Sequence, residues 1–356
     1  MASNGPMILC DGLVKIYKVQ DLEIVALEGL DLIVDRGEFM AIIGPSGSGK
    51  STLMNILGGL DSPSAGRAMV DGQDLLKLSS FALTRYRRRK VGFVWQQPSR
   101  NLIPYLSVEE NVELPMITAG ISYGERKEWT QELLESVGLW DRRHHTLRQL
   151  SGGEQQRTAI GVALANKPVL LLADEPTGEV DTNTAHTILE TLRYLNEEYN
   201  LTIITVTHDP RISDEVDRVV TIRDGRTSSE RVRRLRAEEE EVETDDEKVE
   251  GEREETAAEE KVSYHEYVVV DYAGRLQIPR EFLEELGISD RAEVELAEDG
   301  VLIKPVTAVE EESAQASRLA EVAESWGPQD DSKNWRVRLH DAREGIKNIF
   351  TGNGEN

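Results

Sequence analysis

The sequence predicts an α/β protein built on a parallel sheet, followed by a small β-rich domain. Three observations lead there. Short β-branched and aliphatic runs alternate with helical patterns over residues 1–230. A glycine-rich loop follows one of these runs, and residues 237–260 hold 14 acidic and two basic side chains. Alternating strands and helices are typical of a parallel sheet covered by helices. The acidic stretch has few apolar groups to bury, so we expect a solvated linker or an exposed helix.

The composition excludes several classes of protein. The 41 Lys and Arg against 66 Asp and Glu give a net charge of −25, which opposes broad nucleic-acid binding through phosphate contacts. One cysteine, Cys10, forms no internal disulfide, so we expect a reducing, cytoplasmic compartment. The longest strongly apolar runs hold about five residues, whereas a membrane-spanning helix needs about 20. We also expect no secretory signal at the N-terminus.

The predicted strands of the first domain are apolar runs of four to six residues. They are Phe39–Ile43, Val169–Ala173, Thr202–Thr207 and Val219–Ile222. The first strand leads into a match to G-x-x-x-x-G-K-[ST], and a helix begins with Thr52–Leu57. The matched loop and its next residue are Gly44, Pro45, Ser46, Gly47, Ser48, Gly49, Lys50, Ser51 and Thr52.

This strand, loop and helix predict a nucleoside-triphosphate site. The glycines let backbone N–H groups face a phosphate, and the helix N-terminus adds a favourable partial charge. We expect Lys50 to bridge the β- and γ-phosphates and Ser51 to bind Mg²⁺. The strand at residues 169–173 delivers Asp174 and Glu175, one for the metal shell and one to polarise water.

The segment Leu150-Ser-Gly-Gly-Glu-Gln155 lies between these two motifs, and its glycines precede a helical pattern. In this order the motifs resemble the ATP-binding domain of ABC transporters over residues 7–226. Further segments, such as Asn55–Asp61 and Glu110–Pro115, resemble the group of macrolide exporters, lipoprotein-releasing ATPases and FtsE-like division ATPases. The resemblance implies a P-loop NTPase fold with a helical subdomain.

The resemblance also implies residue roles. Tyr17 would stack on adenine, and Gly44 to Thr52 would wrap the phosphates of ATP. Asp174 would support Mg²⁺ together with Ser51 and Gln96, and Glu175 would be the general base. Gln96 would sense the γ-phosphate, and His208 would contact it. The remaining residues would complete the site across a dimer interface: Ser151, Gly152, Gly153 and Asp181.

One chain has one phosphate loop and one signature segment, so the resemblance implies a homodimer with two shared ATP sites. Closure on ATP and opening after hydrolysis would drive a separate permease of the FtsX or macrolide-exporter type. The chain would lie on the cytoplasmic face of the plasma membrane. The loop at Pro98–Arg100 is about two residues longer than the family pattern, and Glu179-Val180 stands where Asn-Leu is common. In the family the permease docks at the loop that contains Pro98–Arg100, so the extra length of this loop concerns the permease contact.

The rest of the chain predicts a charged linker at residues 231–263 and a second domain at residues 264–308. Arg231, Arg233, Arg234 and Arg236 precede the acidic stretch. Pairing between the two blocks is one interpretation, and a helix with a charged solvent face is the expected one. Strands are expected at Glu266–Val270, Arg275–Ile278, Ala292–Ala297 and Val301–Pro305, and a helix at Arg280–Leu286.

The segment Gly274–Ile288 resembles the AbrB-like swapped-hairpin family, which implies an intertwined dimer. Residues 264–308 have a net charge of −6, which makes DNA an improbable partner and dimerisation the expected role. In the polar tail, residues 309–356, an apolar stripe from Trp335 to Phe350 has helical spacing. That helix would contact a membrane, the permease or this protein itself.

Two alternatives to a transport ATPase stay open. The first is an ATP-driven regulator of an extracytoplasmic cell-wall enzyme, acting through a permease that moves no solute. The second is a DNA-associated regulator, which the charge of the second domain opposes. The resemblance implies that substrate specificity lies in the permease.

Overall fold

The computed structural model describes residues 5–20, 22–208, 212–213, 215–235, 262–270, 274, 276–278, 280–288, 292–297 and 300–305. Two compact units, residues 1–279 and 280–356, are described separately. The acidic stretch at residues 237–260 and the tail at 309–356 lie outside the described residues, so the predictions for them stay predictions. Among the described helices, none has the length and apolarity needed to cross a bilayer.

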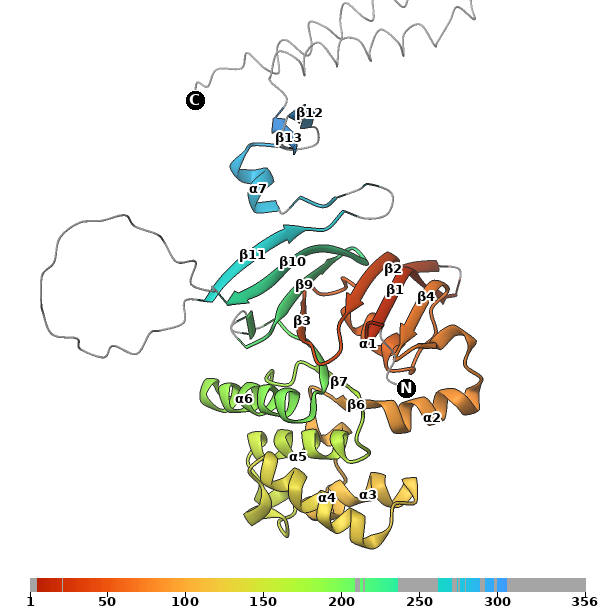
Figure 1. The fold of residues 1–356 in the computed structure, drawn as a ribbon, viewed down its shortest axis with the longest axis vertical. Coiled ribbons are helices and arrows are strands. Elements are labelled where there is room, and N and C mark those ends of the chain that lie inside the picture. Colours follow the sequence, from red (N-terminus) through yellow and green to blue (C-terminus); the bar gives the residue numbers. More distant parts are fainter. Residues whose placement is uncertain are drawn as a thin grey trace, which may run out of the picture. The chain divides into compact units, whose positions relative to one another are not determined.

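A seven-stranded sheet forms the centre of the first unit, in the order β11-β10-β9-β3-β8-β7-β6 (Figure 1). The five strands from β9 to β6 are parallel, and β10 pairs antiparallel with β9 and β11. The predicted strands of the first domain are confirmed to within one residue at each end. The bounds are β3 Phe39–Ile43, β6 Val91–Val94, β7 Leu170–Asp174, β8 Thr202–Val206, β9 Arg218–Arg223, β10 Arg226–Leu235 and β11 Val262–Val268.

Both faces of the parallel part of this sheet are buried, and neighbouring residues of a strand point to opposite faces. In β7, Leu171 and Ala173 pack into one core while Leu170 and Leu172 pack into the other. The first core includes side chains of four helices, which lie together on one side of the sheet in Figure 1. These helices are α3 Val108–Ala119, α4 Tyr123–Ser136, α5 Gly152–Leu164 and α6 Thr182–Tyr199.

The second core lies between the central sheet and a four-stranded antiparallel sheet in the order β2-β1-β4-β5. Helix α1, Lys50–Leu57, contributes Leu53, Met54, Ile56 and Leu57 to this core. The other elements here are β1 Ile8–Val19, β2 Leu22–Val34, β4 Ala65–Val70, β5 Gln73–Asp74 and α2 Ser80–Lys90. Single 3₁₀ turns cover Leu75–Lys77, Pro98–Arg100, Trp140–Arg142 and Leu147–Gln149.

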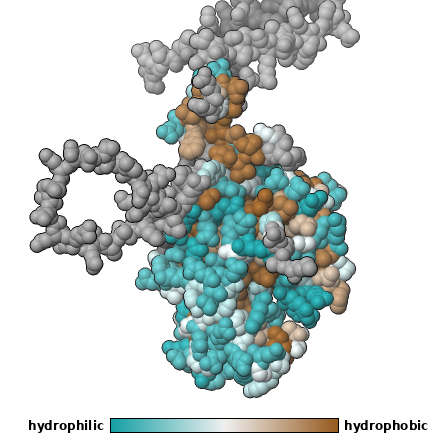
Figure 2. Space-filling model, in the orientation of Figure 1, coloured by the Kyte–Doolittle hydropathy of each residue, from teal (hydrophilic) through white to brown (hydrophobic). Residues whose placement is uncertain are grey.

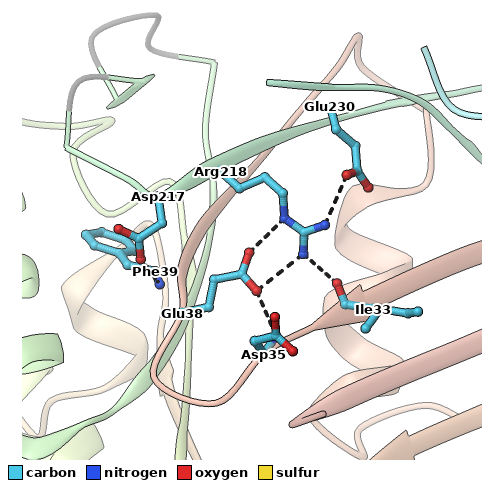
Figure 3. A network of polar contacts seen from close by, with 7 residues as sticks. All are labelled: Ile33, Asp35, Glu38, Phe39, Asp217, Arg218 and Glu230. Atoms are coloured by element: carbon cyan, nitrogen blue, oxygen red, sulfur yellow. Dashed lines mark hydrogen bonds and ion pairs between the residues drawn. The ribbon is translucent and has the colours of Figure 1, made fainter. Parts of the chain in front are cut away.

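The guanidinium of Arg218 links the two sheets (Figure 3). It donates to both carboxylate oxygens of Glu38, just before β3, and to Glu230 on β10. It also donates to the carbonyl oxygen of Ile33 on β2. Glu38 in turn accepts the backbone N–H of Asp35 at 2.7 Å. Four segments thus meet on one mostly buried ion pair.

The region after Arg226 differs from the predicted charged helix. Arg231, Arg233 and Arg234 lie in β10, which pairs with β11 from Ser229↔Val268 to Leu235↔Val262. The helix interpretation of this arginine block is therefore wrong. Pairing with β11 satisfies backbone groups that β10 would otherwise leave open at a sheet edge. The first strand predicted for the second domain begins at Val262, earlier than expected, and is the edge strand of the central sheet.

The second unit contains α7, Arg280–Glu285, and a hairpin of β12, Ala292–Ala297, with β13, Gly300–Pro305. The predicted helix and hairpin are confirmed, while the segment expected as a strand at 275–278 forms an isolated bridge, Val270↔Leu276. The described part of this unit exposes large apolar side chains, visible as the brown surface over α7 and the hairpin in Figure 2. The predicted swapped-hairpin dimer remains a prediction.

Candidate functional site

The loop between β3 and α1 has a backbone that only glycine tolerates at key points. Gly44 has φ 147°, and a Cβ there would lie 2.1 Å from the carbonyl oxygen of Ile222. Gly49, directly before α1, has φ 103°. These conformations are accessible to glycine without the steric cost that a side chain brings. The loop therefore curls around the N-terminus of α1, as a phosphate-binding loop requires.

A cavity of about 500 Å³ opens at this loop. Most of the predicted site residues line it: Gly44, Ser46, Gly47, Ser48, Gly49, Lys50, Ser51, Thr52, Asp174, Glu175 and His208. The buried Ser48 hydroxyl has no hydrogen-bond partner within the part of the chain that the structure describes. An unpaired buried hydroxyl is costly, and a ligand oxygen in the cavity would remove that cost.

The Lys50 ammonium turns back on its own loop. It donates to the carbonyl oxygens of Gly44 at 2.9 Å and Pro45 at 2.8 Å. Burial lowers the pKa of Lys50, while the carboxylates of Glu175 and Asp174 act against that shift. The loop carbonyls hold the cation beside the cavity, where phosphate oxygens would be stronger acceptors for it.

Two carboxylates end β7 at the same cavity. Burial, followed by the charge of Glu175, raises the pKa of Asp174 above its ordinary value of 3.8. Glu175 has φ 46°, an uncommon conformation for a residue with a side chain. Its N–H donates to the Val206 carbonyl at 2.8 Å, which ties the end of β7 to β8. Strained backbone of this kind is often found at functional sites.

Gln96 and His208 converge on one oxygen of Glu175. The Gln96 amide nitrogen lies 3.5 Å from Glu175 Oε2, and His208 Nδ1 lies 3.2 Å from the same oxygen. Gln96 follows β6 and His208 follows β8, the two strands that flank β7. The carboxyl ends of neighbouring parallel strands meet at one edge of a sheet. The fold therefore gathers an acid, an amide and an imidazole beside the phosphate loop.

Tyr17 lies outside the cavity lining, on β1. Its hydroxyl donates to Asp61 at 2.8 Å, and burial raises the pKa of that hydroxyl above its ordinary value. The ring therefore has a fixed partner in the protein before any base binds.

The signature segment and Asp181 also lie outside this cavity. Ser151 caps α5 by accepting the Glu154 N–H at 3.2 Å, and Asp181 caps α6 by accepting N–H groups of Asn183 and Thr184. Thr184 connects the two helix starts, because it donates to Asp181 and its methyl group fills the space beside Gly153. These residues form a second cluster that does not reach the phosphate loop of its own chain.

Some lining residues escaped the sequence analysis. Ala26 and Val206 line the cavity, but an apolar residue inside a strand gives no functional signal. The turn after β9 was also missed. The Gly225 N–H donates to the backbone carbonyl oxygen of Ser48, and the Gly225 carbonyl oxygen accepts the Glu28 N–H. The dipeptide Asp224-Gly225 signals a turn, although not its contact with the phosphate loop.

Comparisons with known proteins show the family and the fold. The family described as "ABC transporter" matches residues 27–178. An uncharacterized ABC transporter ATP-binding protein of Thermotoga maritima is 52% identical over 212 residues, 60% of this chain and 89% of the relative. The macrolide export ATP-binding/permease protein MacB 2 of Aeromonas hydrophila is 44% identical over 227 residues, but the match spans only 35% of its length.

A solved structure shows the same fold. It is described as the dimeric, post-hydrolysis state of the ATP-binding cassette MJ0796 bound to ADP and Pi. The TM-score is 0.58 at 42% identity, covering 63% of this chain and 97% of the other.

Proposed function

Because this chain belongs to the ATP-binding proteins of ABC transporters and is an ATPase, we propose that it works as a homodimer that drives a separate membrane permease. The observation that carries the proposal is the division of the site residues into two clusters. Lys50, Asp174 and Glu175 line the phosphate cavity, whereas Ser151 and Asp181 lie outside it. A second copy would bring its signature cluster to the cavity of the first.

Glu175 is the candidate general base. Its carboxylate lies beside the phosphate loop and can accept a proton from a water that attacks the γ-phosphate. His208 and Gln96, which contact its Oε2, would orient the carboxylate and reach the γ-phosphate. Lys50 would exchange the loop carbonyls for phosphate oxygens.

The residues present fit Mg²⁺. Ser51, Gln96 and Asp174 supply hydroxyl, amide and carboxylate oxygens, the donors that this hard cation prefers. In the parts of the chain that the structure describes, no group of three or more His, Cys, Asp or Glu side chains is arranged to hold a metal ion. A magnesium site can take one carboxylate from the protein and the rest of its ligands from phosphates and water. The metal would supply neutralisation of phosphate charge.

A permease is the proposed partner because the MacB relatives are described as ATP-binding/permease proteins and this chain matches only about a third of their length. Exposed aromatic side chains offer a docking surface: Phe81 on α2 and Tyr105 before α3 are 82% and 79% exposed. A cavity of about 820 Å³ lies between α2 and the residues at the end of α3, lined by Arg85, Tyr86 and Ile121 among others. Such docking would hold the chain at the cytoplasmic face of the plasma membrane.

Residues 264–308 are proposed to add a dimer contact of the AbrB-like type. Val294 and Leu296 share one face of β12 and are 66% and 88% exposed, and their β13 partners are Ile303 and Val301. A lone two-stranded hairpin is marginally stable in water, so an apolar face of this kind favours a second copy as its cover.

The proposal is tested by purifying the full chain from detergent-solubilised membranes as Glu175→Gln with ATP, followed by mass spectrometry. We expect a permease in stoichiometric amount. Lys50→Ala is the matched control, because it should not hold the ATP-closed dimer and should recover less of the same partner. Recovery of the chain alone in both variants, or of DNA, would contradict the permease assignment.

A further inference from the structure

The carboxylate of Asp61 holds the Tyr17 ring in place, and the Tyr17 hydroxyl also meets the Thr52 side chain. Asp61 accepts the Tyr17 hydroxyl on Oδ2 at 2.8 Å and the Lys15 ammonium on Oδ1 at 2.6 Å. The same ammonium lies 4.7 Å from the centroid of the Tyr17 ring, within the range of a cation–π contact. Lys15 and Tyr17 both lie on β1, whose pairing with β2 shifts register between Lys15 and Ile16, and both side chains reach Asp61.

Asp61 is itself fixed to the end of the phosphate-loop helix. Its N–H donates to the Asn55 carbonyl in α1 at 3.1 Å, and its Oδ1 accepts the Ser62 N–H at 2.7 Å. Lys15 also donates to the Ser62 carbonyl at 2.8 Å. The side chains of Lys15 and Asp61 are only 12% and 28% exposed. The contact therefore joins the helix that begins at Lys50 to the strand that carries the ring.

The charge state of Asp61 strengthens its contact with Lys15. Burial alone would raise the pKa of Asp61, but hydrogen bonds from Lys15 and Tyr17 hold that pKa below its ordinary value. The carboxylate is therefore ionised at neutral pH and pairs with Lys15. A charge-assisted hydrogen bond of this kind is shorter and stronger than a neutral one.

We propose that Lys15 and Asp61 are positioning residues for the nucleotide base: they lock the Tyr17 ring at a set distance from the phosphate loop and leave the ring face opposite Lys15 for stacking. This rests on the role of adenine platform that the family resemblance implies for Tyr17 and that we extend to this chain. An ATP molecule must meet the ring and the loop together, so a fixed spacing between them lowers the ordering cost of binding.

The test measures KM and kcat for ATP, and inhibition by inorganic tripolyphosphate, in the full chain. Asp61→Ala and Lys15→Met should raise KM for ATP about tenfold, the scale of one lost stacking contact, with kcat nearly unchanged. Tripolyphosphate lacks a base, so its inhibition constant should stay the same. A merely structural defect would weaken both ligands together.

Three further variants separate the possible outcomes. Lys15→Arg should restore most of the affinity lost in Lys15→Met, and Tyr17→Phe, which keeps the ring but loses the hydroxyl, should raise KM for ATP in the same direction as Asp61→Ala. Lys18→Met on the same strand is the matched control, because its pair with Glu23 is solvent-exposed, and KM should not change. Thermal melting confirms that each variant is folded.

The two proposals fail in different ways. If Tyr17→Ala leaves KM for ATP unchanged, the ring is not the base platform, and the proposed role of Tyr17 is wrong. If Tyr17→Ala raises KM but Asp61→Ala and Lys15→Met do not, the platform stands and the positioning inference is overturned. Equal losses for ATP and tripolyphosphate would also overturn it.

Discussion

At the scale of single residues, the proposed mechanism depends most on Glu175, the candidate general base. Three segments far apart in sequence meet at its carboxylate: the end of β7, Gln96 after β6 and His208 after β8. The carboxylate is 26% exposed, so a water can reach it while the neighbours restrict its orientation. This combination of access and restraint is what general-base catalysis needs.

Glu175→Gln should bind ATP normally and hydrolyse it about 10²–10⁴ times more slowly, because the amide keeps the shape of the side chain but cannot take a proton. Phosphate release measures turnover, and equilibrium binding of a fluorescent ATP analogue measures affinity. A variant with near-normal turnover would remove Glu175 as the base.

Asp174→Asn should stabilise the nucleotide-free protein at neutral pH. The raised pKa means that the folded state prefers protonated Asp174. That preference favours folding below the ordinary pKa of 3.8 and is lost as pH rises through the higher folded value, so the ionised group is a cost at pH 7.5. Thermal melting should give a higher Tm for Asp174→Asn at pH 7.5 and a smaller difference as pH falls. MgATP should stabilise the wild type more than this variant.

At the scale of elements, three helices begin with the same local device. Helices α3, α4 and α5 have Ser107, Ser122 and Ser151 as their N-cap residues. Each serine exchanges hydrogen bonds with a glutamate three residues later. The capping box is thus a structural feature that the signature segment shares with two helices outside the site. Stability alone cannot reveal the function of Ser151.

Ser151→Ala and Ser122→Ala should each cost about 1 kcal/mol of stability, because each removes one N-cap. Only Ser151→Ala should also reduce ATPase activity, since we assign Ser151 to the ATP site of the partner subunit. Thermal melting and steady-state phosphate release, measured on both variants, make the comparison. Equal loss of activity in the two would reduce Ser151 to a cap.

Arg218→Met should destabilise the fold by about 3 kcal/mol, because it leaves the mostly buried Glu38 without its partner (Figure 3). Lys18→Met, which removes the exposed pair with Glu23, should cost less than about 1 kcal/mol. Urea denaturation of the two variants measures the difference. A small effect for Arg218→Met would mean that the link between the two sheets is weak.

The parallel strands could be predicted because a strand buried on both faces is a continuous apolar run, as in Leu170–Ala173. The phosphate loop could be predicted because its residue types are required by its backbone. The pairing of β10 with β11 could not, since the paired residues lie more than 25 positions apart and β10 is rich in arginine, which gives no strand signal. The contact of Gly225 with Ser48 escaped for the same reason: it depends on tertiary approach.

At the scale of the whole molecule, the proposed mechanism depends on two copies meeting. ATP would hold the two phosphate cavities against two signature clusters, and the dimer would open after hydrolysis. A permanent contact elsewhere would keep the copies together through the open stage and raise their effective concentration. The exposed apolar face of the β12–β13 hairpin is suited to this contact.

Removal of residues 280–356 should therefore abolish the nucleotide-free dimer and spare the ATP-dependent one. The deletion falls at the division between the two compact units and leaves β11 in the central sheet. By analytical ultracentrifugation without nucleotide, we expect the full chain to be a dimer and the truncated chain a monomer. With Glu175→Gln and ATP, both should be dimers.

Leu296→Glu should reproduce the truncation because a charge on the apolar face opposes pairing. Glu293→Gln, on the other face of β12, should leave the dimer intact. A truncated chain that stays dimeric without nucleotide would reject residues 280–356 as the second contact and place a nucleotide-independent contact within residues 1–279.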